Sequence, residues 1–151
     1  SYGTLLQERP HDFDPIVGQR MVDGFDVSAT EYLTARRFRD VLQRDAAVAM
    51  ADIDVLLVPT TAFAAPAVDD CDDEGAAYWR VNGMCLRNPA AANLLGLCAI
   101  SLPCGFTDEG LPIGLMLIGR PYEEARLLQL ARAYEGATEW HLARPEMGAF
   151  A

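Results

Sequence analysis

Few side chains in this 151-residue chain could act as a nucleophile: Ser1, Ser28, Ser101 and the four cysteines. A serine or cysteine nucleophile needs a base within hydrogen-bond reach. All twelve basic residues are arginine, there is no lysine, and the only histidines are His11 and His141. No G-x-S-x-G elbow surrounds Ser28 or Ser101. The sequence therefore offers no complete set of groups for nucleophilic catalysis.

Each candidate nucleophile also has a structural interpretation. Ser28 is followed three residues later by Glu31, which is the capping-box pattern at the start of a helix. Ser101 lies inside an apolar, strand-like segment, and Cys104 ends that segment far from either histidine in sequence. A cysteine in that position is typical of a structural thiol. We therefore expect no catalytic residue among them.

Metal sites are not expected either. The cysteines at positions 71, 85, 98 and 104 form no CxxC pair, and neither histidine lies near them in sequence, so the ligand spacing of a zinc site is missing. An acidic run lacks the alternating ligands of a calcium loop and is interpreted as a solvated turn. This run comprises Asp69, Asp70, Asp72, Asp73 and Glu74. We expect neither a metal nor another cofactor.

The composition excludes further classes of protein. A formal charge of −10 and a pI near 4.5 make the chain repel a phosphate backbone, so nucleic acid is not an expected partner. No apolar run approaches the roughly 18 residues of a membrane span, and no export signal begins the chain. We expect a cytoplasmic protein without a membrane partner. A hydrophobic content of 51% is enough for the core of one domain.

The N-terminal half is predicted to be irregular and then helical. Residues 1–27 are punctuated by proline and glycine, with a turn of helix expected near residues 16–22. From the capping box a long helix is predicted, with apolar or small residues at spacings of three and four. This stripe, which we expect to be buried, comprises Ala35, Phe38, Leu42, Ala46, Ala49 and Ile53.

The C-terminal half alternates between strands and helices. Residues 55–58 read as a strand buried on both faces, followed by a loop at 60–66. A helix is predicted over 76–87, and Asn88 with Pro89 would cap a second segment ended by Gly96. Strands at 99–104 and 113–118 are joined by a loop long enough for a hairpin. The last helix, 123–135, carries an apolar stripe of Leu127, Leu130, Ala131 and Tyr134.

This order predicts an α/β fold, because strands buried on both faces need helical layers on both sides. Three strands make a narrow sheet. We therefore expect the sheet to continue into a part of the protein that is absent from this chain.

Three segments in a fixed order carry a resemblance: DVLLVPT at 54–60, NLLGLCAISLPCG at 93–105 and GLPIGLMLIG at 110–119. Together with EEARLL at 123–128, Asp14-Pro15, Arg20 and Gly24, they resemble the C-terminal part of amidase-signature enzymes. The resemblance covers nearly the whole chain, and Cys98 departs from it where the family usually has proline. It implies that residues 1–151 are the C-terminal portion of a three-layer α/β/α domain with a mixed central sheet.

The same resemblance implies that catalysis resides elsewhere. Family members hydrolyse amides with a Ser, Ser, Lys triad in the larger N-terminal portion, and none of the three is present here. The chain alone is therefore expected to be inactive. Its partners would be the N-terminal amidase portion and a small-molecule amide, and self-association is expected where the sheet edge is uncovered.

By resemblance, one face of a helix supplies a wall of the acyl pocket, with Gly83, Leu86 and Ala90 at the matching positions. Their spacing of three and four is one helical face. In relatives that act on glutamine for tRNA charging, Asp stands at the position of Leu86 and an arginine similar to Arg20 binds the substrate carboxylate. Leu86 cannot hold an α-amino group, so an apolar or aryl amide is favoured. Two alternatives stay open, namely a core role for Leu86 and a surface salt bridge for Arg20.

Two functions are compatible with these observations. The first is the C-terminal part of an amidase, which completes the sheet and shapes the acyl pocket. The second is a non-enzymatic binding module or an inactive partner protein derived from the same fold.

Overall fold

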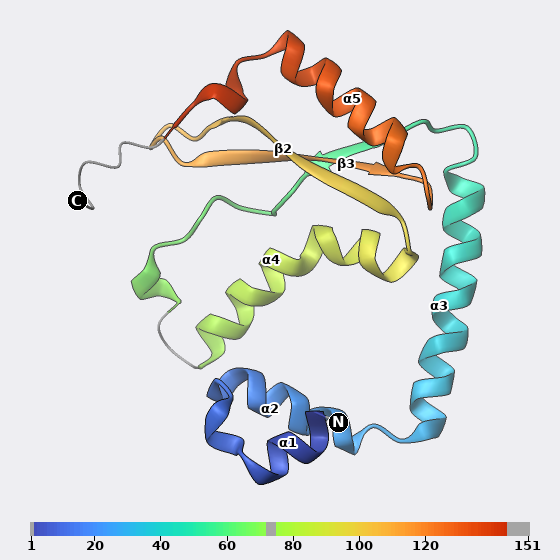
Figure 1. Cartoon of the computed structure of the whole chain (residues 1–151), viewed down its shortest axis with the longest axis vertical. Coiled ribbons are helices and arrows are strands. Elements are labelled where there is room, and N and C mark those ends of the chain that lie inside the picture. The colour runs from blue at the N-terminus through green and yellow to red at the C-terminus, as the bar shows by residue number, and fades with distance from the viewer. Residues whose placement is uncertain (1, 72–74, 145–151) are drawn as a thin grey trace. The chain divides into compact units, whose positions relative to one another are not determined.

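The structure, a computed structural model, describes residues 2–71 and 75–144 (Figure 1). It divides the chain into two compact units, residues 1–41 and residues 42–151. Ser1 and the part of the acidic run at 72–74 lie outside the described residues. Asp69 and Asp70 belong to a single turn of 3₁₀ helix, Val68–Asp70, and are exposed.

The first unit is more helical than the sequence suggests. It contains α1 (Tyr2–Glu8) and α2 (Pro15–Asp23) before the long helix α3 (Ala29–Ala49) begins. The expected turn of helix at 16–22 is confirmed, but the prediction of irregular structure over 1–27 is wrong. Pro10 and Pro15 each stand in the first turn of a helical segment, where a missing N–H costs nothing, so they begin helices and do not interrupt them.

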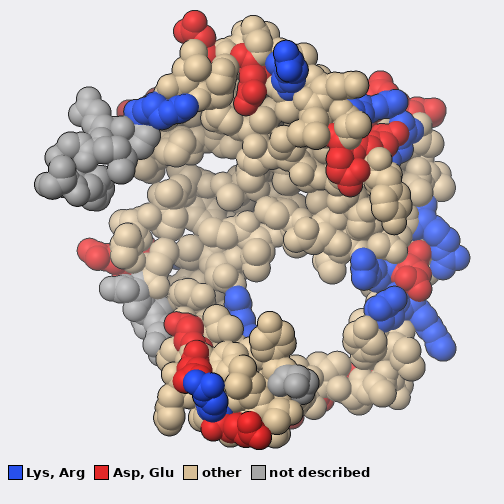
Figure 2. All heavy atoms as spheres, in the orientation of Figure 1, with Lys and Arg blue, Asp and Glu red and all other residues tan. Residues whose placement is uncertain are grey.

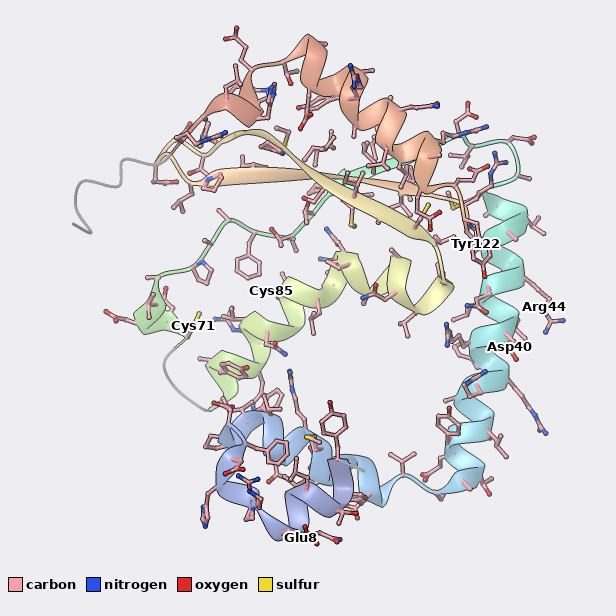
Figure 3. The ribbon with its side chains drawn as sticks, viewed as in Figure 1. Glu8, Asp40, Arg44, Cys71, Cys85 and Tyr122 are labelled. Atoms are coloured by element: carbon pink, nitrogen blue, oxygen red, sulfur yellow. The ribbon has the colours of Figure 1, made fainter. Side chains whose placement is uncertain are left out.

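The start of α3 is the predicted capping box. The backbone N–H of Glu31 donates to Ser28 Oγ at 3.2 Å, and the backbone N–H of Ser28 donates to Glu31 Oε2 at 2.9 Å. The prediction of a buried stripe along α3 is wrong within this chain, because no residue of the helix is buried and Phe38 is 64% exposed. Asp40 and Arg44 project from the same helix (Figure 3). Amphipathic spacing identifies the apolar face of a helix but not what covers it.

Three antiparallel strands form the sheet: β1 (Leu56–Pro59), β2 (Cys98–Phe106) and β3 (Pro112–Gly119) in the order β1-β3-β2. A hairpin joins β2 to β3, and its loop is closed by the Thr107 N–H donating to the Leu111 carbonyl at 2.8 Å. The strand predicted to be buried on both faces is an edge strand here, and Leu57 on it is 58% exposed. That prediction fails because an apolar run reports the environment of a strand only when the neighbouring strands and helices are present.

Helices cover both faces of this sheet, as Figure 1 shows for α5 (Glu124–Ala137) and α4 (Ala76–Leu95). Alternate residues of the strands point to opposite faces. Leu102 and Leu117 therefore pack with Leu127 and Ala131 of α5, whereas another core lies on the α4 side. This second core contains Ala92, Met116 and Ile118. The predicted three-layer arrangement is confirmed, although Leu130 of the expected α5 stripe is 40% exposed.

One helix replaces the two that were predicted at 76–95. α4 continues through Pro89, which stands inside it. Asn88 does not cap a second helix, because its Nδ2 donates to the Pro59 carbonyl of β1 at 2.8 Å. Gly96 ends the helix in the left-handed conformation, with φ of 70°, as expected for a C-terminal glycine.

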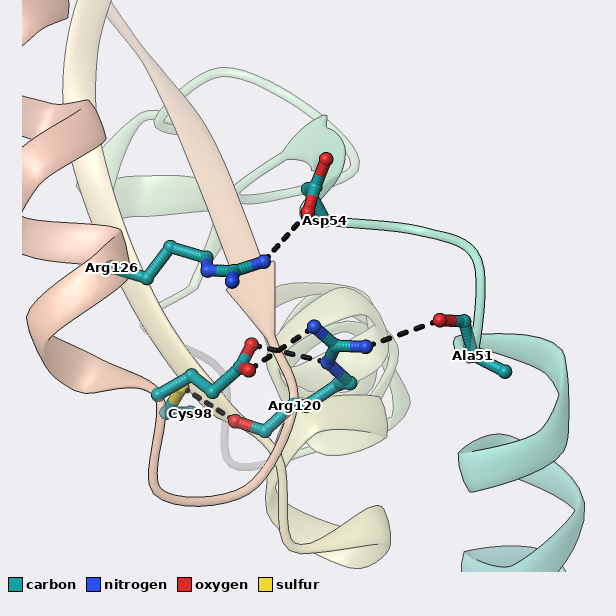
Figure 4. A network of polar contacts seen from close by, with 6 residues as sticks. Ala51, Asp54, Cys98, Arg120 and Arg126 are labelled. Atoms are coloured by element: carbon teal, nitrogen blue, oxygen red, sulfur yellow. Dashed lines mark hydrogen bonds and ion pairs between the residues drawn. The ribbon is translucent and has the colours of Figure 1, made fainter.

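A polar network fixes the segment after α3 to the turn between β3 and α5 (Figure 4). Arg120 forms an ion pair with Glu123 at 3.1 Å, and its Nη1 donates to the Ala51 carbonyl at 3.1 Å. Arg126 of α5 pairs with Asp54 at 2.6 Å. The turn also holds Tyr122 at a φ of 64°, with its side chain 93% exposed (Figure 3). These contacts attach the segment before β1 to the far end of the central strand.

Candidate functional site

The rotation of α4 about its axis is set by residues that face the sheet. Asn88 bonds to β1, and Ala92, one turn further on, is 4% exposed in the core with Met116 and Ile118. Residues at i and i+4 lie on the same helical face. The side of α4 that carries Asn88 and Ala92 therefore packs on the sheet, and the opposite side is directed away from it.

Gly83, Leu86 and Ala90 lie on that opposite side. Leu86 is 51% exposed, Gly83 is exposed with no atom within 4 Å of the position of an added Cβ, and Ala90 is half-buried. The structure thus brings the three predicted residues onto one surface. Leu86 is half exposed among the described residues, and its place in the acyl-pocket wall stays a prediction.

Arg20, the fourth predicted substrate-binding residue, is exposed on α2 in the unit formed by residues 1–41. Gly83, Leu86 and Ala90 belong to the other unit. The role of Arg20 in binding a substrate anion stays a prediction.

The residues considered as nucleophiles have structural partners. Ser28 caps α3, and Ser101 Oγ lies 2.6 Å from Thr60 Oγ1, a hydroxyl that is no general base. The thiol of Cys104 donates to the Ile113 carbonyl at 3.5 Å. These contacts agree with the structural roles assigned to Ser28, Ser101 and Cys104 from the sequence.

The contact between Thr60 and Ser101 was not anticipated from the sequence. Gly114 of β3 lies beneath the two hydroxyls: a Cβ added there would stand 2.7 Å from Thr60 Oγ1 and 2.9 Å from Ser101 Oγ. The Thr60 N–H also donates to the Gly114 carbonyl at 2.8 Å. The three residues therefore form a hydroxyl clip, defined here as Thr60, Ser101 and Gly114, that links the end of β1 to β2 across β3. A glycine inside a strand marks such a close approach, and this was the only signal in the sequence.

Charge is distributed without a dominant basic surface on the face in view. Figure 2 shows Arg side chains beside Asp and Glu side chains. Within residues 2–71 and 75–144, no group of three or more His, Cys, Asp or Glu residues is arranged to hold a metal ion. No helix in the same ranges is long and apolar enough to cross a membrane.

Comparison with known proteins identifies the family. The family described as Amidase matches residues 2–128. The chain belongs to the amidase family. The resemblance to amidase-signature enzymes seen in three separate sequence segments is thereby confirmed.

Similar proteins locate the chain within that family. It is 37% identical to a glutamyl-tRNA(Gln) amidotransferase polypeptide of Synechococcus sp. strain JA-2-3B'a(2-13), over 93% of this chain and 27% of that protein. A crystal structure of an amidase matches with a TM-score of 0.74 and 25% identity, over 90% of this chain and 31% of the other. The allophanate hydrolase of Kluyveromyces lactis, in its S177A form, matches with a TM-score of 0.73 and 27% identity, over 86% and 21%.

The chain thus spans less than a third of the length of these relatives. It matches the C-terminal portion of amidase-signature enzymes. The predicted fold class, part of an amidase-signature α/β/α fold, is confirmed. The three strands described here are all antiparallel, so a mixed central sheet in the complete domain stays a prediction.

Proposed function

We propose that the chain functions as the C-terminal portion of an amidase, where it completes the central sheet and supplies one wall of the acyl pocket. The observation that carries this proposal is the setting of α4. Its sheet side is fixed by Asn88 and Ala92, and Leu86 remains half exposed on the opposite side. An apolar side chain on the free face of a covering helix is suited to contact a substrate or another part of the enzyme.

The free edge of the sheet supports the N-terminal amidase portion as the partner. Among the described residues, β1 pairs only with β3, so its other edge offers unpaired backbone N–H and C=O groups. Leu56 is 42% exposed and Leu57 is 58% exposed on this strand. An uncovered apolar edge strand favours pairing with another strand. Phe38 on α3 adds further exposed apolar surface.

An apolar or aryl amide is the proposed substrate class. Leu86 provides no charge for an α-amino group, while Gly83 and Ala90 beside it leave room for a bulky acyl group. A pocket without a polar partner discriminates against a charged substrate, because the substrate loses its hydration without compensation. Arg20 would serve a substrate that carries a carboxylate.

The relatives raise a second candidate. The Synechococcus protein is named as part of a glutamyl-tRNA(Gln) amidotransferase, and its 37% identity favours a related role here. Glutamine would then be the amide donor. Leu86 argues against this second function and in favour of the first.

The two candidates differ in their response to Leu86→Asp, measured in a complex with the N-terminal amidase portion. For an apolar amide we expect kcat/KM to fall at least about tenfold, since an uncompensated carboxylate in an apolar pocket is costly. Unfolding of the isolated chain should change little, because the side chain is 51% exposed. Leu128→Asp on α5, at a residue 59% exposed, is the matched control and should leave kcat/KM unchanged. A variant that unfolds, or that keeps the full kcat/KM for the apolar amide, contradicts the first proposal, whereas glutamine turnover by the unsubstituted complex would favour the second candidate.

The proposal assigns the catalytic residues to the N-terminal amidase portion. Amide hydrolysis by this chain alone would therefore contradict it. We expect the purified chain to hydrolyse none of a panel of aryl and alkyl amides above background, since its sequence has no lysine to activate a serine nucleophile. The N-terminal amidase portion should restore turnover. Activity of the chain that survives repurification and is lost in Ser101→Ala or Cys104→Ala would refute this.

A further inference from the structure

A cavity of about 440 Å³ lies between the β2–β3 hairpin and residues 140–144, which follow α5. Its volume is in the range of small-molecule sites. Aromatic and proline side chains make up much of the wall, together with one histidine and one arginine. It includes Pro103, Phe106, Pro112, Trp140, His141 and Arg144. Residues 140–144 lie beyond the segment matched by the family, and none of the cavity residues belongs to the outer face of α4.

Aromatic rings form the floor for a flat ligand. Phe106 and Trp140 meet edge to face, with ring centroids 6.1 Å apart and planes at 63°. Trp140 is 42% exposed and Phe106 is 45% exposed, so both rings keep accessible surface. Aromatic surfaces in this arrangement favour another ring in offset or edge contact.

Arg144 is the charged side chain among the residues that line the cavity. Nη1 of Arg144 donates to the carbonyls of His141 and Ala143, at 2.8 and 3.0 Å, which orients the guanidinium. The remaining guanidinium N–H groups are suited to a carboxylate, which arginine binds in a planar, bidentate geometry. Asp108 and Glu109 belong to the same hairpin but do not line the cavity.

The side chain of His141 also lines the cavity. Its Nδ1 is buried and has no hydrogen-bond partner in the described part of the chain. Buried polar atoms without a partner are uncommon in folded proteins. The cavity therefore combines an oriented cation with two aromatic rings that keep accessible surface.

We propose that this cavity binds a small aryl carboxylate, with the ring against Phe106 and Trp140 and the carboxylate on Arg144. The site is separate from the acyl-pocket wall on α4 and does not depend on amide hydrolysis. Because an amidase that acts on aryl amides releases an aryl carboxylic acid, such a site would bind a compound of the same chemical class as that product.

Tryptophan fluorescence of the chain tests this proposal directly. Trp79→Phe leaves Trp140 as the only tryptophan, since the chain has two. We expect phenylacetate to change the Trp140 emission with a saturable dependence on concentration. Acetate, which lacks the ring, and 2-phenylacetamide, which lacks the charge, should bind at least about tenfold more weakly, because charge-assisted hydrogen bonds are the stronger ones.

Substitutions test whether Arg144 is the cation that binds the carboxylate. Arg144→Gln should weaken phenylacetate binding at least about tenfold, because the amide keeps hydrogen bonding but loses the charge. Arg132→Gln, at an exposed position of α5 that does not line the cavity, is the matched control and should bind normally. Chemical-shift mapping of the Trp140 indole and the Phe106 amide provides a second readout, and circular dichroism checks that the variants fold.

The proposal fails on any of three results. One is the absence of saturable change in both fluorescence and chemical shift. Another is equal binding of phenylacetate and 2-phenylacetamide, or tighter binding of benzylamine, which would show that the site does not select an anion. The third is a folded Arg144→Gln variant with unchanged affinity. None of these results bears on the role of Leu86, so this proposal and the amidase proposal fail separately.

Discussion

Replacing Gly114 with alanine would place a methyl group under the hydroxyl clip. The added Cβ would stand 2.7 Å from Thr60 Oγ1, 3.1 Å from Thr60 Cβ and 2.9 Å from Ser101 Oγ. Separations below 3.0 Å require the neighbours to move. Thr60 cannot move freely, because its N–H is bonded to the Gly114 carbonyl. The substitution therefore separates the two hydroxyls, which now lie 2.6 Å apart.

The expected destabilisation follows from three contributions. Overpacking by one methyl group costs about 2 kcal/mol, within the usual range of such insertions. Loss of the hydroxyl–hydroxyl hydrogen bond costs about 1 kcal/mol more. Alanine also restricts the unfolded chain more than glycine does, and this offsets about 0.7 kcal/mol of the lost stability. The free energy of unfolding should thus fall by about 2 kcal/mol, or about 4–8 °C in Tm for a chain of this size.

Urea denaturation of the purified chain, followed by circular dichroism, measures this change. Gly136→Ala in α5 is the control, because no atom lies within 4 Å of its added Cβ. It should stabilise the chain by up to about 1 kcal/mol, since alanine is the better helix former.

A double-mutant comparison isolates the cause. In a Thr60→Ala, Ser101→Ala background both oxygen atoms are gone, and Gly114→Ala should then cost less than about 1 kcal/mol. An equal cost in the two backgrounds would show that the hydroxyls are not the obstacle and would refute the reasoning.

Three further predictions concern the helices and the sheet edge. The hydroxyl and then the backbone N–H of Ser28 lower the pKa of Glu31, so this carboxylate stabilises the helix above its ordinary pKa and ceases to do so as pH falls through the lowered value. Ser28→Ala should raise the pKa of Glu31, as measured by an NMR titration, and an unchanged pKa would contradict the capping geometry. Pro89→Ala should raise the free energy of unfolding by about 1–3 kcal/mol by restoring a helical N–H to bond with Cys85, and lower stability would show that proline is required there. The uncovered edge of β1 should make the isolated chain self-associate and bind a hydrophobic dye, whereas a monomer in sedimentation that binds no dye would contradict this.

Local features could be predicted because their causes lie within a few residues. The capping box of Ser28 and Glu31, the left-handed glycine at position 96 and the hairpin between the last two strands are all as expected. Leu127 and Ala131 are buried as their spacing indicates. The errors within residues 10–23 and within α4 arose where proline was interpreted as an interruption. Proline begins helices in the first unit and is accommodated inside α4.

Burial and the candidate site depended on the tertiary structure. The spacing of Gly83, Leu86 and Ala90 placed them on one helical face. The tertiary contacts of Asn88 with Pro59, across 29 residues, and of Ala92 with the core determined which way that face points. The clip between Thr60 and Ser101 and the ring contact between Phe106 and Trp140 likewise join residues from separate elements. Sequence alone indicated the family and the alternation of helices and strands after residue 28, because capping, turn formation and hydrophobic periodicity act over a few residues. The tertiary structure decided which apolar faces are covered, because burial depends on neighbours that are distant in sequence.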